Sequence, residues 1–518
     1  MNGGADNKTD CIDVLKNICL GISPQVHAAF ISSFVAGMIT HLYMITNKIP
    51  NWDDISCYNF PGQTDGVGRW FLTYINRLST VFSNPAIHGI FAILFFSVAV
   101  AIIVASLKIR TVTGAVLIGT IMITFPSVTS MMMFMFTVNC YAFAAAMAAL
   151  SAFIVIRYGW KGSAFSVILL VLSTATYQMF FLFAVCILLT ELIVSMFRDD
   201  SDLKCYLKKG IMYLIVLVIS LIVYVASVKL GPWQLSEYRG FSDMGNISLS
   251  NIPVLVMRDI HRLLQFFVTE PPSYVHTFFR VMNISAVIMA AAFSLILLVK
   301  NVHMISKKIL AVVLMMLLVI SAGGIYLLAP ATDNASTIMI YPYIFLYIYV
   351  IAASEYVTIP KNIIVSSAIC IVVASISYSG FLIANGAYYR NKLAFDRVTA
   401  FYNRIMVKVE AQEGYTYDQK LLIAGDYWPD PNILSACNLD GDDYEDMEGV
   451  AIENGLFTSG IRYNFLKLYL GIQGEEVEDD EIDKVESSDE FKSMPSYPSD
   501  GCVKKIDDVW VVKINDIK

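Results

Sequence analysis

The hydrophobic positions of this chain are gathered in runs of roughly 20 residues, the length at which a helix crosses about 30 Å of hydrocarbon. Stretches such as 211–228 and 309–328 lack the regularly spaced polar positions of a helix with one face in water. The pattern predicts a mainly α fold, a polytopic membrane helical bundle. About eleven spans are expected, near 26–46, 86–107, 111–127, 137–156, 163–177, 179–197, 210–228, 283–300, 308–329, 337–356 and 361–384.

The pattern changes after residue 384, where polar and apolar positions mix. We expect a helix over 390–409, a strand over 420–424, a helix over 460–471 and a strand over 509–514. An acidic stretch, 475–490, is expected to be a solvated loop. The chain is thus divided into an N-terminal segment (1–25), a membrane domain (26–384) and a small α/β domain (385–518).

Lysine and arginine in the short loops predict the orientation, because cytoplasmic loops carry an excess of both. Alternate loops hold them, whereas the short loops 127–136, 177–178 and 330–336 hold none. We therefore expect a cytoplasmic N-terminus and an extracytoplasmic C-terminal domain. Loops 47–85 and 229–282 also face outward. The basic residues of the cytoplasmic set are Lys108, Arg110, Arg157, Lys161, Arg198, Lys204, Lys208, Lys209, Lys300, Lys307, Lys308 and Lys361.

Composition narrows the function further. The chain has 57% hydrophobic and 15% charged residues and a net charge of −7, without the basic stripe typical of nucleic-acid binding. Its nine cysteines form no CxxC pair and show no zinc spacing. Cys437 and Cys502 both fall in the external domain, where a disulfide is permissible, but spacing alone cannot establish a bond, and two free thiols are favoured slightly.

The first external loop holds candidate catalytic residues. Asp53 and Asp54 are adjacent carboxylates just past the first span, and they are either a solvated loop feature or a general base. Further along, Asp65 precedes Gly68-Arg69-Trp70, and the run 67–82 has apolar residues at helical spacing, which predicts a helix lying in the membrane interface. Its arginines, Arg69 and Arg77, either touch lipid headgroups or, for Arg69, bind a phosphate beside the carboxylates.

Two other external segments add candidates for substrate binding. In loop 229–282, Arg258, His261 and Arg262 share one helical face, and Arg239 and Arg280 lie nearby in the sequence. These cations can bind a lipid phosphate or form an ordinary interfacial face. Tyr177-Gln178 stands at the tip of a predicted hairpin between the fifth and sixth spans, where the pair can hydrogen-bond a sugar or anchor the interface.

Several mechanisms are disfavoured by what the sequence lacks. No HExxH, Walker A, GxSxG or Rossmann glycine pattern occurs in a suitable context. The ionisable His41 and Glu191 fall toward helix ends, whereas coupled transporters place charges nearer the midplane.

Taken together, the chain resembles the GtrII family of bacterial membrane glucosyltransferases, which have GT-C type architecture. One departure is Cys57, which stands where the family pattern often has arginine. Another is the loop near Asn139, which lacks the second acidic residue of some GT-C enzymes. The matching features are Asp53-Asp54, Gly68-Arg69-Trp70, Tyr177-Gln178, Met494-Pro495-Ser496-Tyr497-Pro498 and Asp508-Val509-Trp510-Val511-Val512-Lys513.

This resemblance implies a specific reaction. A sugar, glucose in this family, moves from a polyprenyl phosphate carrier onto a cell-surface polysaccharide at the outer face of the bacterial plasma membrane. It implies no metal and no cofactor, since arginines can stabilise a leaving phosphate monoester. The competing hypotheses are a transporter or flippase of lipid-linked sugars and a non-catalytic scaffold that binds surface polymer.

Overall fold

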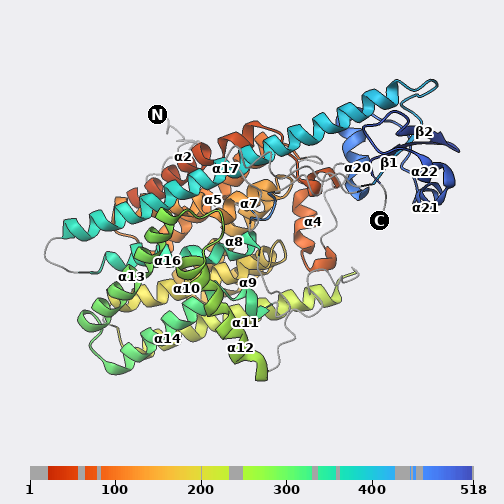
Figure 1. Ribbon diagram of the computed structural model, residues 1–518. Coiled ribbons are helices and arrows are strands. Elements are labelled where there is room, and N and C mark those ends of the chain that lie inside the picture. The colour runs from red at the N-terminus through yellow and green to blue at the C-terminus, as the bar shows by residue number, and fades with distance from the viewer. Residues whose placement is uncertain are drawn as a thin grey trace, which may run out of the picture.

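The structure is a helical bundle from which one long helix leads to a small sheet (Figure 1). The computed structural model describes residues 21–56, 65–78, 83–199, 201–232, 249–328, 336–357, 362–425, 444, 447–450 and 459–515. The main helices of the bundle are α2 (Pro24–Thr46), α5 (Pro85–Leu107), α6 (Val112–Thr124), α7 (Pro126–Met133), α8 (Val138–Tyr158), α9 (Ser163–Thr174), α10 (Met179–Arg198), α11 (Leu203–Leu230), α13 (Thr277–Lys300), α14 (Ile305–Ala322), α16 (Phe345–Ser354) and α17 (Asn362–Glu410).

The number of spans agrees with the prediction once one helical stretch is divided. In the described part of the chain, nine stretches are long and apolar enough to cross a membrane, and ten if α6 and α7, bent by 41°, form one broken span. One stretch, Val138–Thr174, folds back at Gly159–Gly162. The hydrogen bonds between its two arms show this: the Ser151 hydroxyl contacts the Ser166 hydroxyl at 2.9 Å, and the Ser173 hydroxyl donates to the Ala144 carbonyl at 2.7 Å. Counting its two arms separately gives eleven passages.

Polar helix-breaking residues set several of the helix ends. Asn84 precedes Pro85, and its side-chain oxygen accepts from the Ile87 N–H at 3.2 Å, so α5 starts with its first amides satisfied. At the start of α6, the Glu355 carboxylate accepts from the Arg110 and Thr111 amides at 2.8 and 2.9 Å. Its negative charge is favourable there because the N-terminal end of a helix carries a partial positive charge.

The connections gather at two ends of the bundle. Gln25 donates to the Arg110 carbonyl at 2.7 Å, and Glu355 accepts from the Arg110 amide at 2.8 Å, so the start of α2, the α5–α6 loop and the end of α16 lie together. Asn301 donates to the Phe197 carbonyl at 3.1 Å, which joins the ends of α13 and α10. At the other end, the Phe71 amide donates to the Ala175 carbonyl at 3.0 Å. The external loops predicted at 47–85 and 229–282 contain short elements: α3 (Trp52–Ser56), η1 (Asp65–Val67), α4 (Trp70–Asn76), η4 (Leu249–Asn251), α12 (Ile252–Leu264) and η5 (Gln265–Thr269).

Helix α4 is shorter than the interfacial helix expected over 67–82. Gly68 has φ of 74°, which interrupts the helix before Trp70, and the helical residues end at Asn76. Leu72 and Asn76 are buried, so α4 packs on the protein as well as at the interface. Residues 79–82 lie outside the described part.

Helix α17 joins the two domains without a break. Its 49 residues run from the bundle to the sheet, so the expected boundary at 384–385 falls inside one continuous helix (Figure 1). The expected span and the expected helix over 390–409 are two halves of this element. The C-terminal domain is therefore attached rigidly through α17.

The C-terminal sheet has three strands in the order β1-β3-β2. Strands β1 (Lys420–Ala424) and β3 (Val509–Lys513) match the two expected strands and pair in parallel, Lys420 with Val509. Strand β2 (Val503–Ile506) was not expected; it pairs antiparallel with β3 through a turn at Asp507, whose φ is 51°. The expected helix over 460–471 is α20 (Ser459–Phe465) with η8 (Leu466–Leu470).

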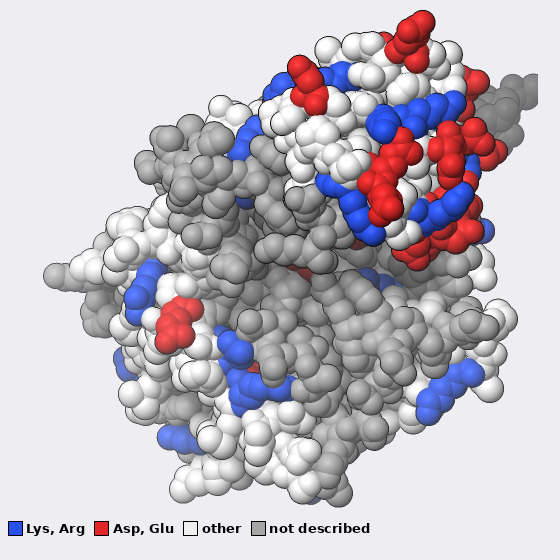
Figure 2. Space-filling model, turned by 45° about the vertical axis from the view of Figure 1, so that its right-hand side comes forward, with Lys and Arg blue, Asp and Glu red and all other residues white. Residues whose placement is uncertain are grey.

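The acidic stretch 475–490 is helical from Asp479 onward apart from Ser488, so its assignment as a loop was wrong over that part. Helix α21 (Asp479–Ser487) starts with a capping box in which Glu478 and Glu481 bond each other's backbone amides, and Val485 buries one face. Helix α22 (Asp489–Ser493) follows, with Phe491 buried. Figure 2 shows the charged side chains of this domain interspersed, and pairs such as Lys484–Asp507 at 2.7 Å and Lys504–Glu490 at 2.5 Å offset the acid.

Candidate functional site

The two carboxylates of the first external loop have different surroundings. Asn51 is the N-cap of α3: its side-chain oxygen accepts from the Asp54 amide at 3.0 Å, and the Asp54 carboxylate accepts from the Asn51 amide at 3.3 Å. Asp54 is only 5% exposed, and burial raises its pKa, although the Lys48 charge favours the anion. Asp54 thus has a structural role, because its two reciprocal hydrogen bonds with Asn51 fix the start of α3.

Asp53 is half-buried on the same short helix and belongs to a different neighbourhood. The charges of Arg69, Asp53 and Glu448 all act on the hydroxyl of Tyr141, in the first turn of α8. A carboxylate and a guanidinium from separate parts of the first loop therefore lie within electrostatic range of one tyrosine.

Arg69 is held by the hairpin tip, 109 positions away in sequence. Its Nε donates to the Gln178 side-chain oxygen at 3.3 Å, and its guanidinium carbon lies 4.4 Å from the centre of the Tyr177 ring. The Gln178 amide nitrogen donates to the Val67 carbonyl at 2.7 Å and to the Tyr224 hydroxyl at 3.1 Å. The structure therefore brings together three residues that the sequence analysis singled out separately.

An aromatic platform lies beneath Arg69. The Tyr141 and Tyr177 rings are 4.9 Å apart, and both side chains are buried. On the adjoining turn, the Trp70 indole donates to the Ser227 hydroxyl of α11 at 3.0 Å. These contacts fix the Gly68-Arg69-Trp70 turn against three helices of the bundle, so Arg69 is positioned by rigid elements.

The arginines of the second large loop make mainly structural contacts. Arg280 donates to the Val268 and Thr269 carbonyls at 3.0 and 2.6 Å, which caps η5. Arg258 donates to the Tyr326 carbonyl at 2.9 Å, and Arg262 donates to the Gln265 side chain at 3.1 Å. His261 is exposed on α12. Of this set, His261 and Arg262 fit best the predicted role of binding phosphate, because neither caps a backbone carbonyl in these contacts.

Helix α12 also carries a buried carboxyl that sequence reasoning missed. Asp259 is fully buried against Gly323, just before the short helix α15 (Ile325–Leu328), and neither carboxyl oxygen has a hydrogen-bond partner in the structure as described. Burial raises the pKa of Asp259 to about 7. The sequence feature that could have identified Asp259 is its place four positions after Leu255, on the buried face of the amphipathic helix α12.

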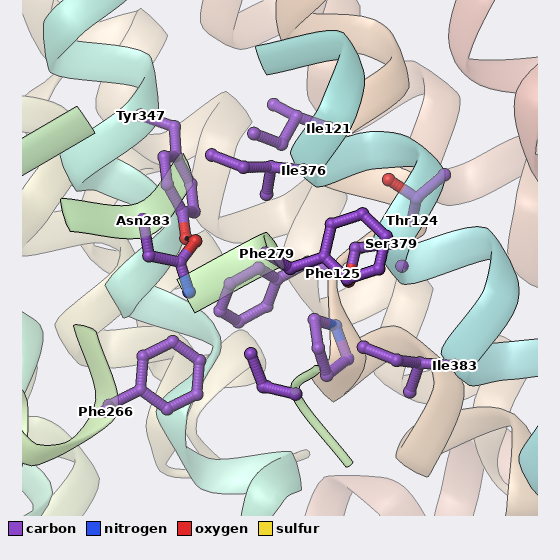
Figure 3. Close-up of a pocket in the computed structure, with 13 residues that line it drawn as sticks. Ile121, Thr124, Phe125, Phe266, Phe279, Asn283, Tyr347, Ile376, Ser379 and Ile383 are labelled. Atoms are coloured by element: carbon purple, nitrogen blue, oxygen red, sulfur yellow. Dashed lines mark hydrogen bonds between the residues drawn. The ribbon is translucent and has the colours of Figure 1, made fainter. Parts of the chain in front are cut away.

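A small cavity lies among α6, α13, α16 and α17, and Figure 3 shows its mainly aromatic and aliphatic lining. The Tyr347 hydroxyl donates to the Asn283 side chain at 2.8 Å at its edge. Its volume of about 20 Å³ suits one water molecule and is far too small for a sugar. This cavity is not a substrate site in the form seen here.

Four of the singled-out residues have side chains that the structure does not describe. Asp65 begins η1, but its side chain lies outside the described set, as do Cys57 and Arg239. Cys437 is also outside, so its pairing with the buried Cys502 stays a prediction. In the parts that are described, no group of three His, Cys, Asp or Glu side chains is placed to hold a metal ion.

The ionisable residues inside the bundle have structural partners. His41 contacts the Tyr388 hydroxyl at 2.7 Å and the Ile123 carbonyl at 3.0 Å. Glu191 accepts from Lys209 at 2.7 Å and from the Tyr213 hydroxyl at 2.9 Å. These contacts join helices to one another, so neither residue favours an ion-coupled transporter.

The structure is thus a many-span helical bundle in which Arg69 of the first large loop contacts the Tyr177-Gln178 hairpin tip. Residues 42–354 match the model of the family described as Glucosyl transferase GtrII, and the chain belongs to this family. It is accordingly a glycosyltransferase and a multi-span membrane protein. The matched region includes Asp53, Arg69 and the Tyr177-Gln178 tip and ends before α17. No curated protein and no solved structure matches the chain.

Proposed function

We propose that the protein transfers glucose from a polyprenyl phosphate carrier onto a cell-surface polysaccharide at the outer face of the bacterial plasma membrane. The observation that carries this proposal is the contact of Arg69 with Tyr177 and Gln178 at the hairpin tip, with Asp53 within electrostatic range of the adjoining Tyr141. The N-terminus is cytoplasmic and the C-terminal domain extracytoplasmic, since the basic loops lie at the opposite end of the bundle from this site.

In this mechanism Asp53 is the general base. The acceptor hydroxyl oxygen bonds to the anomeric carbon, its proton passes to the Asp53 carboxylate, and the bond between the anomeric carbon and the phosphate oxygen breaks. The electron pair of that bond leaves with the polyprenyl phosphate. Asp53 suits this role better than Asp54, because Asp54 is buried and bonded to its own helix N-terminus.

Arg69 binds the departing phosphate. A guanidinium presents a fixed fork of donors that matches phosphate oxygens, and it stays charged at any physiological pH. Its contacts with Gln178 and Tyr177 hold it in place before the donor arrives, so little reorganisation is needed as negative charge develops on the phosphate.

The test uses the purified protein in liposomes, synthetic glucosyl polyprenyl phosphate labelled in the sugar, and polysaccharide isolated from cells that lack the protein. We expect label to move into the polymer. Transfer from a nucleotide sugar, with none from the lipid-linked sugar, would overturn the proposed donor. Label that crosses the membrane but never enters the polymer would favour the flippase instead.

A further inference from the structure

The segment 447–450 of the C-terminal domain is seated on the bundle. The Ser130 hydroxyl of α7 donates to the Glu448 carbonyl at 2.6 Å, and the Asn391 amide of α17 donates to the Gly449 carbonyl at 2.8 Å. Met447 and Val450, on either side, are 1% and 5% exposed. The segment is therefore anchored by both its backbone and its side chains.

Gly449 allows this close approach. Its φ is 90°, and an added Cβ would lie 2.5 Å from the Met133 Cβ and 3.1 Å from the Phe134 ring. Only glycine accepts both the backbone conformation and the lack of space. The position of Glu448 is thus set by its neighbour.

Met133 and Phe134, which lie against Gly449, also contact helix α3, which carries Asp53 and Asp54. The Asn51 side-chain amide nitrogen donates to the Met133 carbonyl at 2.9 Å, and the Trp52 ring packs edge-on against Phe134 at 6.3 Å between centroids. Helix α20 of the C-terminal domain packs against α3 as well. Two domains therefore meet at Met133–Phe134, with Asp53 on one side and Glu448 on the other.

We propose that Glu448 is an acceptor-binding residue, supplied to the site by the C-terminal domain, and that it accepts hydrogen bonds from saccharide hydroxyls. This inference rests on the proposed function and adds to it the place where the acceptor binds. A carboxylate accepts hydrogen bonds only, which suits a polyol and repels a phosphate. Glu448 therefore belongs with the acceptor, and Arg69 with the donor.

Electrostatics agrees with this division. Glu448 and Asp53 act on the same Tyr141 hydroxyl as Arg69 does, so the site has a cationic part and an anionic part around one tyrosine. A saccharide bound by Glu448 would present a hydroxyl toward Asp53. The family match ends at residue 354, so this residue lies beyond the region that the family model describes.

The experiment compares Glu448→Gln with Glu476→Gln, which removes a charge from the same domain at an exposed position. Rates are measured in full-length protein with labelled glucosyl polyprenyl phosphate and isolated polysaccharide, together with the slower transfer of glucose to water. For Glu448→Gln we expect the acceptor KM to rise by about tenfold or more, because the acceptor loses hydrogen bonds to a charged group. Transfer to water should stay unchanged, and Glu476→Gln should match the wild type.

Each outcome decides the question. An unchanged acceptor KM in a folded Glu448→Gln protein would overturn the inference, as would equal loss of transfer to polymer and to water. Gly449→Ala supplies a second test, since displacing the segment should raise the acceptor KM in the same direction. If the wild type itself transfers no glucose from the lipid donor, the proposed function fails, a result distinct from the failure of this inference.

Discussion

Asn51 and Asp54 exchange two hydrogen bonds across the first turn of α3, at 3.0 and 3.3 Å. This exchange separates the roles of two carboxylates that are adjacent in sequence. Asp54 fixes the helix, and Asp53, one position earlier, is half-buried within electrostatic range of Tyr141.

Asp53→Asn should reduce glucose transfer by on the order of 10²–10⁴, because the amide keeps the shape but cannot take the acceptor proton. Asp54→Asn keeps an oxygen that can accept from the Asn51 amide, so we expect a smaller loss of transfer. Rates with labelled lipid donor, together with thermal unfolding in detergent, separate the two. Wild-type transfer by both variants would exclude Asp53 and Asp54 as the base and direct attention to loop 229–282.

Arg69→Ala should raise the KM for the lipid donor, and Gln178→Ala should have a weaker effect in the same direction. Gln178 contacts Arg69 at 3.3 Å and also holds the preceding backbone through Val67, so its loss loosens the arginine without removing the charge. Arg77→Ala is the matched control, an exposed arginine of the same loop. If Arg69→Ala and Gln178→Ala had the same donor KM as Arg77→Ala, the assignment of Arg69 to the phosphate site would be wrong.

The candidate site shows what a sequence can and cannot predict. Asp53 and Gln178 were identifiable because each lies beside a span end, where polar residues are few, and Arg69 because it stands in the Gly68-Arg69-Trp70 motif of the same loop as Asp53. Glu448 was not, because nothing in the sequence indicates that a tail segment packs on Met133. Asp259 was hidden among the arginines of α12, and only the contact with Gly323 shows that it faces inward.

Secondary structure failed where composition was given more weight than local signals. The stretch 475–490 is rich in acid, yet Glu478 and Glu481 have the spacing of a capping box, and acidic side chains favour the first turn of a helix. The strand β2 was missed because its inner residues are Lys504 and Lys505, both exposed. Buried Val503 and Ile506 at its ends supply the packing.

The orientation is checked by labelling. A cysteine introduced as Glu476→Cys, exposed and before α21, should react with a membrane-impermeant reagent on intact cells. A cysteine introduced at Lys161, in the basic loop between α8 and α9, should react only after lysis. The reverse pattern would place the C-terminal domain and the Asp53 site in the cytoplasm, where a flipped lipid donor is not required.

Chelation should leave transfer unchanged. The proposed leaving group is a phosphate monoester held by Arg69, so the mechanism needs no divalent ion. Transfer is measured with excess EDTA and again after adding back magnesium or manganese. A loss on chelation that either metal restores would contradict the assignment of phosphate stabilisation to arginine.

The stability of the bundle should depend on pH through Asp259. Burial raises its folded pKa to about 7, above the value near 4 of an unfolded aspartate, so the folded state prefers the protonated carboxyl. The resulting stability is fully present below about pH 4 and is lost as pH rises through 7. The midpoint temperature of thermal unfolding in detergent should therefore fall as pH rises from 5 to about 8. Asp259→Asn should reduce this pH dependence, because the asparagine side chain cannot ionise. Gly323→Ala should lower stability at every pH, since its Cβ would lie 1.6 Å from an Asp259 oxygen. Gly210→Ala controls for the loss of a glycine, because its Cβ would meet only the end of the Leu192 side chain at an ordinary 3.4 Å. An identical slope in wild type and Asp259→Asn would show that other groups set the pH dependence.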